Sequence, residues 1–195
     1  MELRVLKHEV IDLENTVYDL DKEISASLSQ FHGIELNPYA AMVARTDLQI
    51  AREQALERSY EWFKDTALQP PHFLPLVNEA KGIACGNAFT IDWSDFVTPS
   101  PDLFVFGNPP FAGDYNKSQE QQKELDDIFF SPYPAGNLDY CAAWYLKATK
   151  FLNGTGAKFA FVSTNSITQG VQVEGLFKPV FDLGWRISFA WPSFL

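Results

Sequence analysis

Apolar residues recur along the chain with the period of a helix in several segments. In residues 2–25 they fall every three or four positions with charged residues between them, as on one face of a helix. The same spacing runs over residues 38–62, after the pair Asn37-Pro38, which suits a helix N-cap and first position. The apolar face of this second helix is formed by Ala41, Ala44, Leu48, Ala51 and Ala55. Further helices are expected over residues 137–152 and 172–182.

Compact apolar runs lie between these helices and predict short strands. The runs cover residues 31–36, 82–86, 102–106, 157–162 and 186–191. Strands that alternate with helices, each a continuous apolar run, indicate a largely parallel sheet covered on both faces. We therefore expect an α/β fold with a doubly wound, mainly parallel sheet.

Two polar segments interrupt this alternation. Residues 64–80 include three prolines and are expected to form an irregular connector. Residues 112–124 are rich in Gln, Lys and Asp and have no clear period. We interpret this second segment as a mobile loop over a site.

Composition narrows the class of protein. A chain of 195 residues with 46% hydrophobic and 15% aromatic residues can bury the core of one domain, and it lacks the polar bias of disordered proteins. Without an apolar stretch of about 18 residues, it is expected to cross no membrane and to be cytoplasmic. The net charge of -10 argues against a large nucleic-acid surface on this chain alone.

The two cysteines lie in apolar segments and form no metal-ligand pattern. Cys85 and Cys141 are not part of a CxxC pair, and no cluster of His or Cys has the spacing of a metal site. We expect two small buried thiols in a reducing compartment, with no disulfide and no metal.

Polar residues follow three of the predicted strands directly. They are Glu35-Leu36-Asn37, Gly86-Asn87-Ala88 and Gly107-Asn108-Pro109. In open parallel sheets, ligands bind outside the carboxyl ends of the strands. The three strand ends are therefore expected to line one cleft.

The sequence Asn108-Pro109-Pro110-Phe111 has chemistry suited to a planar amine. Two prolines fix φ and lack N–H groups, so the turn is stiff and exposes carbonyl oxygens. The Asn108 side-chain oxygen and the Pro109 carbonyl could accept from one amino group, while Phe111 offers a flat face for a base. The four residues alone could equally be a strand that ends on proline beside an aromatic plug.

This turn resembles the catalytic signature of class I S-adenosylmethionine-dependent methyltransferases that act on amino groups of DNA bases. In that family Asn-Pro-Pro-(Phe/Tyr) follows the fourth strand, so the resemblance implies a catalytic role for Asn108, Pro109, Pro110 and Phe111. It also implies S-adenosylmethionine as cofactor. The residues that correspond to the cofactor site are Glu35 for the ribose hydroxyls, Leu36 for the adenine, Asn87 with Ala88 where the family often has Asp, and Asn108.

Other segments resemble the family more narrowly. Asn137-Leu138-Asp139-Tyr140 is similar to the start of the helix after the catalytic strand, where Asp139 and Tyr140 could contact the cofactor or form only helix structure. Residues 33–51 and 161–194 resemble MmeI-like restriction-modification enzymes. That resemblance implies methylation of adenine N6 in DNA, with DNA bound by domains outside this chain.

The same turn leaves other functions open. It also serves methylation of cytosine N4, of RNA bases and of glutamine amides in proteins, since all present a planar amine. From a different class, the chain could be a non-catalytic remnant that acts as a binding or assembly module.

One part of the family's cofactor site is missing from the sequence. The family has a Gly-rich turn after its first strand, and no Gly-x-Gly precedes Glu35. We therefore expect residues 1–195 to be a partial catalytic domain without the first and last strands, the target recognition domain or the nuclease. Such a chain would be inactive alone and bind S-adenosylmethionine weakly or not at all, and its incomplete sheet could self-associate.

Overall fold

The computed structural model describes residues 27–63, 82–113, 116–129 and 135–191, with no side-chain description for residues 59–63. The predicted helix over residues 2–25 and the predicted connector over residues 64–80 lie outside the described residues. The chain divides into two compact units, Met1–Asp92 and Trp93–Leu195, here called unit 1 and unit 2. Each is described separately below.

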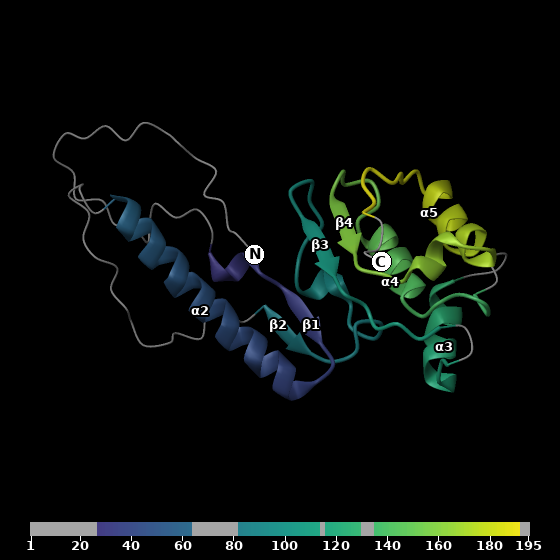
Figure 1. Cartoon of the computed structure of the whole chain (residues 1–195), viewed down its shortest axis with the longest axis horizontal. Coiled ribbons are helices and arrows are strands. Elements are labelled where there is room, and N and C mark those ends of the chain that lie inside the picture. Colours follow the sequence, from purple (N-terminus) through teal and green to yellow (C-terminus); the bar gives the residue numbers. More distant parts are fainter. Residues whose placement is uncertain (1–26, 64–81, 114–115, 130–134, 192–195) are drawn as a thin grey trace. The chain divides into compact units, whose positions relative to one another are not determined.

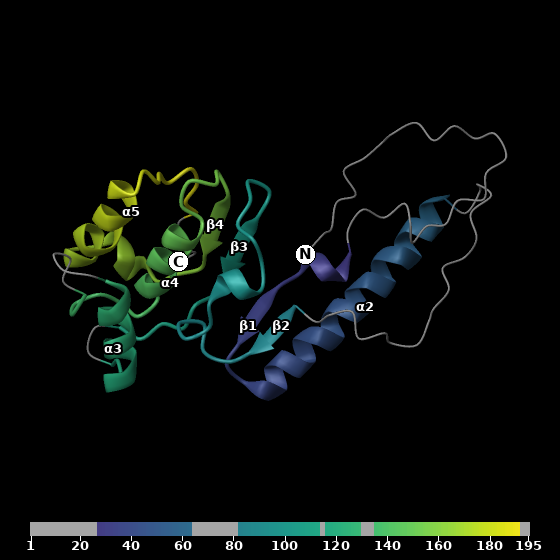
Figure 2. The same cartoon turned by 180° about the vertical axis from the view of Figure 1, so that it is seen from behind.

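Unit 1 is built on two parallel strands and one long helix. Strand β1 (Gly33–Glu35) pairs with β2 (Ile83–Cys85), and Glu35 lies opposite Cys85 in the register. Helix α2 (Pro38–Phe63) runs along this pair in both Figure 1 and Figure 2. A short 3₁₀ turn (Leu28–Gln30) precedes β1.

Helix α2 begins where the sequence predicts. The Asn37 side-chain oxygen accepts from the backbone N–H groups of Tyr39 (2.9 Å) and Ala40 (3.3 Å), which satisfies two donors that the first turn leaves free. Arg45 donates from Nη2 to the Ile83 carbonyl (2.7 Å) and ties the helix to β2. The expected apolar face is only partly buried: Ala41 is buried, whereas Ala51 is exposed.

Unit 2 holds a second parallel pair with its own helices. Strand β3 (Phe104–Gly107) pairs with β4 (Lys158–Phe161), so that Gly107 lies opposite Phe161. The helices are α3 (Gln119–Ile128), α4 (Ala142–Phe151) and α5 (Lys178–Asp182), with 3₁₀ turns at Trp93–Asp95 and Asn165–Thr168. The core includes Leu125, Leu138, Leu146, Leu152, Leu176 and Val180.

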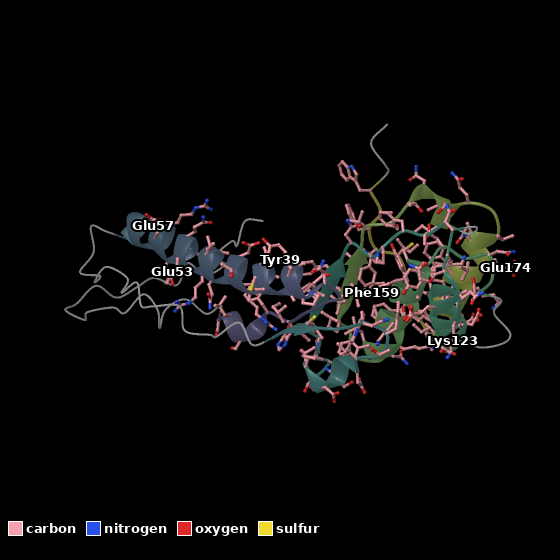
Figure 3. All side chains as sticks on the ribbon, turned by 90° about the horizontal axis from the view of Figure 1, so that it is seen from below. Tyr39, Glu53, Glu57, Lys123, Phe159 and Glu174 are labelled. Carbon is pink, nitrogen blue, oxygen red and sulfur yellow. The ribbon has the colours of Figure 1, made fainter. Side chains whose placement is uncertain are left out.

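Aromatic rings pack on the β4 side of unit 2. Phe159, labelled on β4 in Figure 3, lies among the rings of Tyr145 (6.1 Å between centroids), Phe161 (5.7 Å) and Trp185 (5.0 Å). Edge contacts at these distances add to the area that the rings bury. This cluster fixes α4 against β4.

The expected mobile loop over residues 112–124 is wrong in its second half, because α3 begins at Gln119. The Ser118 hydroxyl accepts from the Gln121 backbone N–H (3.1 Å), and the Gln121 side chain accepts from the Ser118 N–H (2.9 Å). This capping box satisfies the free end of a helix that is otherwise polar. Leu125, which is fully buried, anchors it, and its polar side chains face solvent.

The helix expected over residues 137–152 starts five residues late, at Ala142. The backbone N–H of Asp139 donates to the Gln172 side chain (2.9 Å), and that of Tyr140 donates to the Ala112 carbonyl (3.2 Å). Because these groups bind other segments, residues 136–141 form turns. The helix expected over residues 172–182 is present as a π-helical turn (Val173–Phe177) followed by α5.

The fifth strand expected over residues 186–191 is wrong. The segment has no regular structure, and among the described residues nothing pairs with it. A strand needs a neighbour for its backbone N–H and C=O groups, so apolar alternation alone does not form one. Ile187, Phe189 and Trp191 are exposed.

The α/β class and the parallel pairing of successive strands are confirmed, with two two-stranded sheets. A single doubly wound sheet without its first and last strands stays a prediction. Both cysteines are free, and Cys141 is buried, but Cys85 is exposed at the end of β2, contrary to expectation. No helix in the described part of the chain combines the length and apolarity needed to cross a bilayer.

Candidate functional site

The 108–111 turn, residues Asn108, Pro109, Pro110 and Phe111, leaves the sheet at the carboxyl end of β3. The Gly107 carbonyl still accepts from the Val162 N–H (3.0 Å), which extends the ladder beyond β4. The prolines that follow have no N–H to continue it. The strand therefore ends at the position that the sequence predicts.

The groups of this turn that could hold an amine are unengaged. Asn108 is exposed and Phe111 is 45% exposed, whereas Pro109 between them is buried. Within the described residues, the Asn108 amide and the Pro109 carbonyl make no hydrogen bond, and the Phe111 ring makes no ring contact. The Asn108 amide and the Phe111 ring are thus exposed, and the carbonyl of the buried Pro109 has no hydrogen-bond partner among the described residues.

The backbone directly after Phe111 is anchored to the start of α4. The Ala112 N–H donates to Asp139 Oδ1 (3.2 Å), and the Ala112 carbonyl accepts from the Tyr140 N–H (3.2 Å). Asp139 is only 2% exposed and Tyr140 is 6% exposed. Asp139 therefore binds the chain itself, and Tyr140 donates from its hydroxyl to Glu124 and packs edge-on against Trp144.

The ionisable groups beside this anchor have pKa values that move away from neutrality. Burial, with Asp139 nearby, raises the pKa of the Cys141 thiol to about 12. Burial also raises the pKa of Tyr145 and, together with Glu124, that of Tyr140. None of these three groups can serve as a general base near pH 7. In the described residues, no group of three His, Cys, Asp or Glu could hold a metal ion.

Four of the predicted cofactor residues lie together in unit 1. The Gly86 N–H donates to the Glu35 carbonyl (2.9 Å), and the Cys85 thiol lies 3.8 Å from the Leu36 carbonyl, so the ends of β1 and β2 are adjacent. Glu35, Leu36, Asn87 and Ala88 therefore share one end of this strand pair. Asn108, the fifth predicted residue, belongs to unit 2.

The side chains at this end are one carboxylate, one leucine and one amide. Glu35 uses Oε1 to accept from the Asn37 N–H (2.9 Å), and in the described residues Oε2 has no hydrogen bond. The Leu36 side chain is 70% exposed and follows Glu35 directly. The Asn87 oxygen accepts from the Phe89 N–H (2.8 Å) in an Asx turn.

Sequence reasoning did not identify three polar residues beneath the turn. Thr164 and Ser166 donate to Asp139 Oδ2 (3.2 and 3.5 Å), and Gln172 holds the Asp139 N–H. The only signal in the sequence was the polar run Ser163-Thr164-Asn165-Ser166 directly after an apolar strand. That run alone does not show which carboxylate it meets.

Comparison with known proteins places this arrangement in a family. The family described as MmeI, DNA-methyltransferase domain, matches residues 1–195. A Bacillus subtilis (strain 168) protein named DNA methyltransferase A is 40% identical over 173 residues, which are 87% of this chain and 19% of that protein. The solved structure of the type IIL restriction-modification enzyme MmeI in complex with DNA covers 87% of this chain and 22% of its own, at 32% identity and a TM-score of 0.72.

These matches span nearly all of this chain but about a fifth of each relative, 19% and 22%. The chain belongs to the family of MmeI DNA-methyltransferase domains.

Proposed function

We propose that the chain is part of a DNA methyltransferase that acts on the N6 amine of adenine, with S-adenosylmethionine as methyl donor, in a restriction-modification system. The single observation that carries the proposal is the 108–111 turn, whose Asn108 amide, Pro109 carbonyl and Phe111 ring are unengaged among the described residues. Membership of the MmeI family supports DNA as the substrate. MmeI itself was solved in complex with DNA.

The turn would act by positioning and by accepting hydrogen bonds. A target adenine must leave the duplex to reach such a site. Its ring would stack on Phe111, and its two N6 hydrogens would point to the Asn108 oxygen and the Pro109 carbonyl. These bonds draw electron density onto a nitrogen whose lone pair is otherwise delocalised into the ring, and they aim it in one direction.

The cofactor residues in unit 1 have separate tasks. Glu35 Oε2 would accept from a ribose hydroxyl, Leu36 would cover the adenine ring, and Asn87 would accept from the adenine amine beside Ala88. When bound, S-adenosylmethionine would supply an electrophilic methyl group on its sulfonium, whose sulfur would keep the electrons of the carbon–sulfur bond. N6 would lose one proton, and Tyr140, Cys141 and Tyr145 would not accept it near pH 7, because their raised pKa values keep them protonated.

The experiment is methylation of DNA by the complete gene product with labelled S-adenosylmethionine, followed by analysis of the nucleosides. Wild-type protein should yield N6-methyladenine, and Asn108→Ala should lose about 100- to 1,000-fold in kcat, the cost of removing one acceptor from such a site. Asn153→Ala is the matched control, because Asn153 is also exposed but precedes the amino end of β4.

Three results would contradict the proposal. Label in cytosine, RNA or protein would replace adenine as the substrate. Unchanged kcat in Asn108→Ala would remove the catalytic assignment. A wild-type protein that transfers no methyl group to any of these would favour a binding or assembly module.

A further inference from the structure

Asp139 is a buried carboxylate on which four donors converge. Its Oδ1 accepts from the backbone N–H groups of Ala112 (3.2 Å) and Cys141 (3.3 Å). Its Oδ2 accepts from the hydroxyls of Thr164 (3.2 Å) and Ser166 (3.5 Å). A carboxylate is an acceptor only, so every partner suits it, and at 2% exposure it has almost no access to water.

The donors come from three separate segments. Ala112 directly follows Phe111, Cys141 leads into α4, and Thr164 and Ser166 follow β4. The Thr164 and Ser166 hydroxyls are also within hydrogen-bond distance of each other. Each has a single hydrogen, so when Ser166 donates to Thr164, only Thr164 donates to the carboxylate. The carboxylate thus joins the segment after the predicted catalytic turn to the carboxyl end of the neighbouring strand.

Ala112 is held at both of its backbone polar groups. The Ala112 N–H donates to the Asp139 side chain. The Ala112 carbonyl accepts from the N–H of Tyr140, the residue that follows Asp139. At the other end of the turn, the Gly107 carbonyl is held by Val162. Only residues 108–111 lie between these two attachments, so the place of Ala112 limits where the Phe111 ring and the Pro109 carbonyl can lie.

Asp139 is itself held from below. Gln172 accepts from the Asp139 N–H (2.9 Å) and donates to the Asn137 carbonyl (2.6 Å). Lys117 donates to the Leu138 carbonyl (2.5 Å). The turn that carries Asp139 is therefore held by hydrogen bonds that do not involve Ala112.

We propose that Asp139 is a positioning residue for methyl transfer: it fixes Ala112 and thereby sets the geometry of the 108–111 turn. The inference rests on the proposed function for its kinetic consequence. Its structural half, the attachment of Ala112, does not depend on any activity.

Two substitutions of Asp139 distinguish the loss of its hydrogen-bond acceptors from the loss of its negative charge. In Asp139→Ala the Ala112 N–H loses its acceptor. In Asp139→Asn the amide oxygen can still accept from Ala112 and Cys141, while its NH₂ group meets two hydroxyls that can rotate to accept. Asp139→Asn should therefore restore most of what Asp139→Ala loses.

A pair of threonine variants controls for the loss of a threonine hydroxyl: Thr164 is half-buried and Thr149 is fully buried. Thr164→Val removes one donor to Asp139 without changing the side-chain shape. Thr149→Val makes the same change in α4, where the fully buried Thr149 hydroxyl binds only the Tyr145 carbonyl (2.7 Å). In the part of the chain that the structure describes, the Thr149 side chain makes no hydrogen bond to Asp139 or to the turn.

The variants are made in the complete gene product, and two quantities are measured. The first is hydrogen–deuterium exchange at the Ala112 amide, which should be protected in wild type and in Asp139→Asn but fast in Asp139→Ala. The second is kcat for DNA methylation beside the KM for DNA. Asp139→Ala should lower kcat about 100-fold, the effect of misplacing reacting groups by about 1 Å, with a much smaller change in KM.

The outcomes are distinct. Thr164→Val should lower kcat and Ala112 protection more than Thr149→Val, which decides the matter if Asp139→Ala does not fold. Unchanged Ala112 exchange in Asp139→Ala, or equal effects of the two threonine variants, would overturn the inference. A wild-type protein without methylation would overturn the proposed function, and Ala112 exchange would still decide the attachment.

Discussion

Gln172 offers a sharp test of the polar network beneath the turn. Its side chain is 9% exposed and makes two hydrogen bonds, to the Asp139 N–H (2.9 Å) and to the Asn137 carbonyl (2.6 Å). Gln172→Leu keeps a similar volume and removes both. The Asp139 N–H is then buried without a partner, whereas the carbonyl of Asn137, an exposed residue, can turn to water.

The free-energy cost of Gln172→Leu has two parts, one for the Asp139 N–H and one for the Asn137 carbonyl. A buried donor left unsatisfied costs about 1–3 kcal/mol, and the loss of a bond that water can replace costs about 0.5–1.5 kcal/mol. The sum is about 1.5–4.5 kcal/mol of local stability. At about 1.4 kcal/mol per tenfold, amides that exchange through opening of this region should exchange about 10- to 1,600-fold faster.

The assay is hydrogen–deuterium exchange of the peptide that covers residues 135–151, in wild type and variant. Gln122→Leu is the matched control, because Gln122 makes one hydrogen bond to Asp126 (2.9 Å) on the exposed side of α3. Such a surface pair contributes about 0.2–0.5 kcal/mol. If Gln172→Leu accelerates exchange no more than Gln122→Leu does, the network does not stabilise the start of α4 and the reasoning is refuted.

Two further predictions concern unit 1 and the cysteines. Gly82→Ala should destabilise the β1–β2 pair by at least about 1–3 kcal/mol, because its Cβ would lie 2.2 Å from the Phe31 carbonyl oxygen; wild-type exchange in both strands would contradict this. At pH 8 iodoacetamide should label the exposed Cys85 and spare the buried Cys141, and equal labelling of both cysteines would contradict this. Burial raises the pKa of the Cys141 thiol to about 12 in the folded protein. The neutral thiol therefore contributes stability that is fully present below about pH 9 and is lost as the pH rises toward 12.

Local signals in the sequence predict the elements that depend on local chemistry. Asn37-Pro38 correctly starts α2, since the cap needs only its own side chain and the next N–H groups. Gly107-Asn108-Pro109 correctly ends β3, because proline removes the donor that the ladder requires. The capping box of Ser118 and Gln121 is also a local signal, and it predicts the start of α3 better than the polar composition of residues 112–124 does.

Features that depend on distant partners could not be predicted. Asp139 reads in sequence as a helix start or a ligand contact, because Ala112, Thr164 and Ser166 come beside it only after folding. The 186–191 segment has the alternation of a strand, yet a strand also needs a neighbour, and none is present among the described residues. The apolar run around Cys85 predicts a buried thiol, but Cys85 is the last residue of β2 and its side chain is exposed there.

The attachments on either side of the 108–111 turn explain why its binding groups can be exposed and still be well placed. Fixing one residue of backbone costs about 1–2 kcal/mol, so ordering four residues would cost about 4–8 kcal/mol if the substrate had to do it. Here the hydrogen bonds at Gly107 and at Ala112, together with the burial of Pro109 between them, already order the turn when the protein folds. In the proposed function, an amine that enters the site would order only itself, so the hydrogen bonds at Asn108 and Pro109 would remain available to stabilise the transition state.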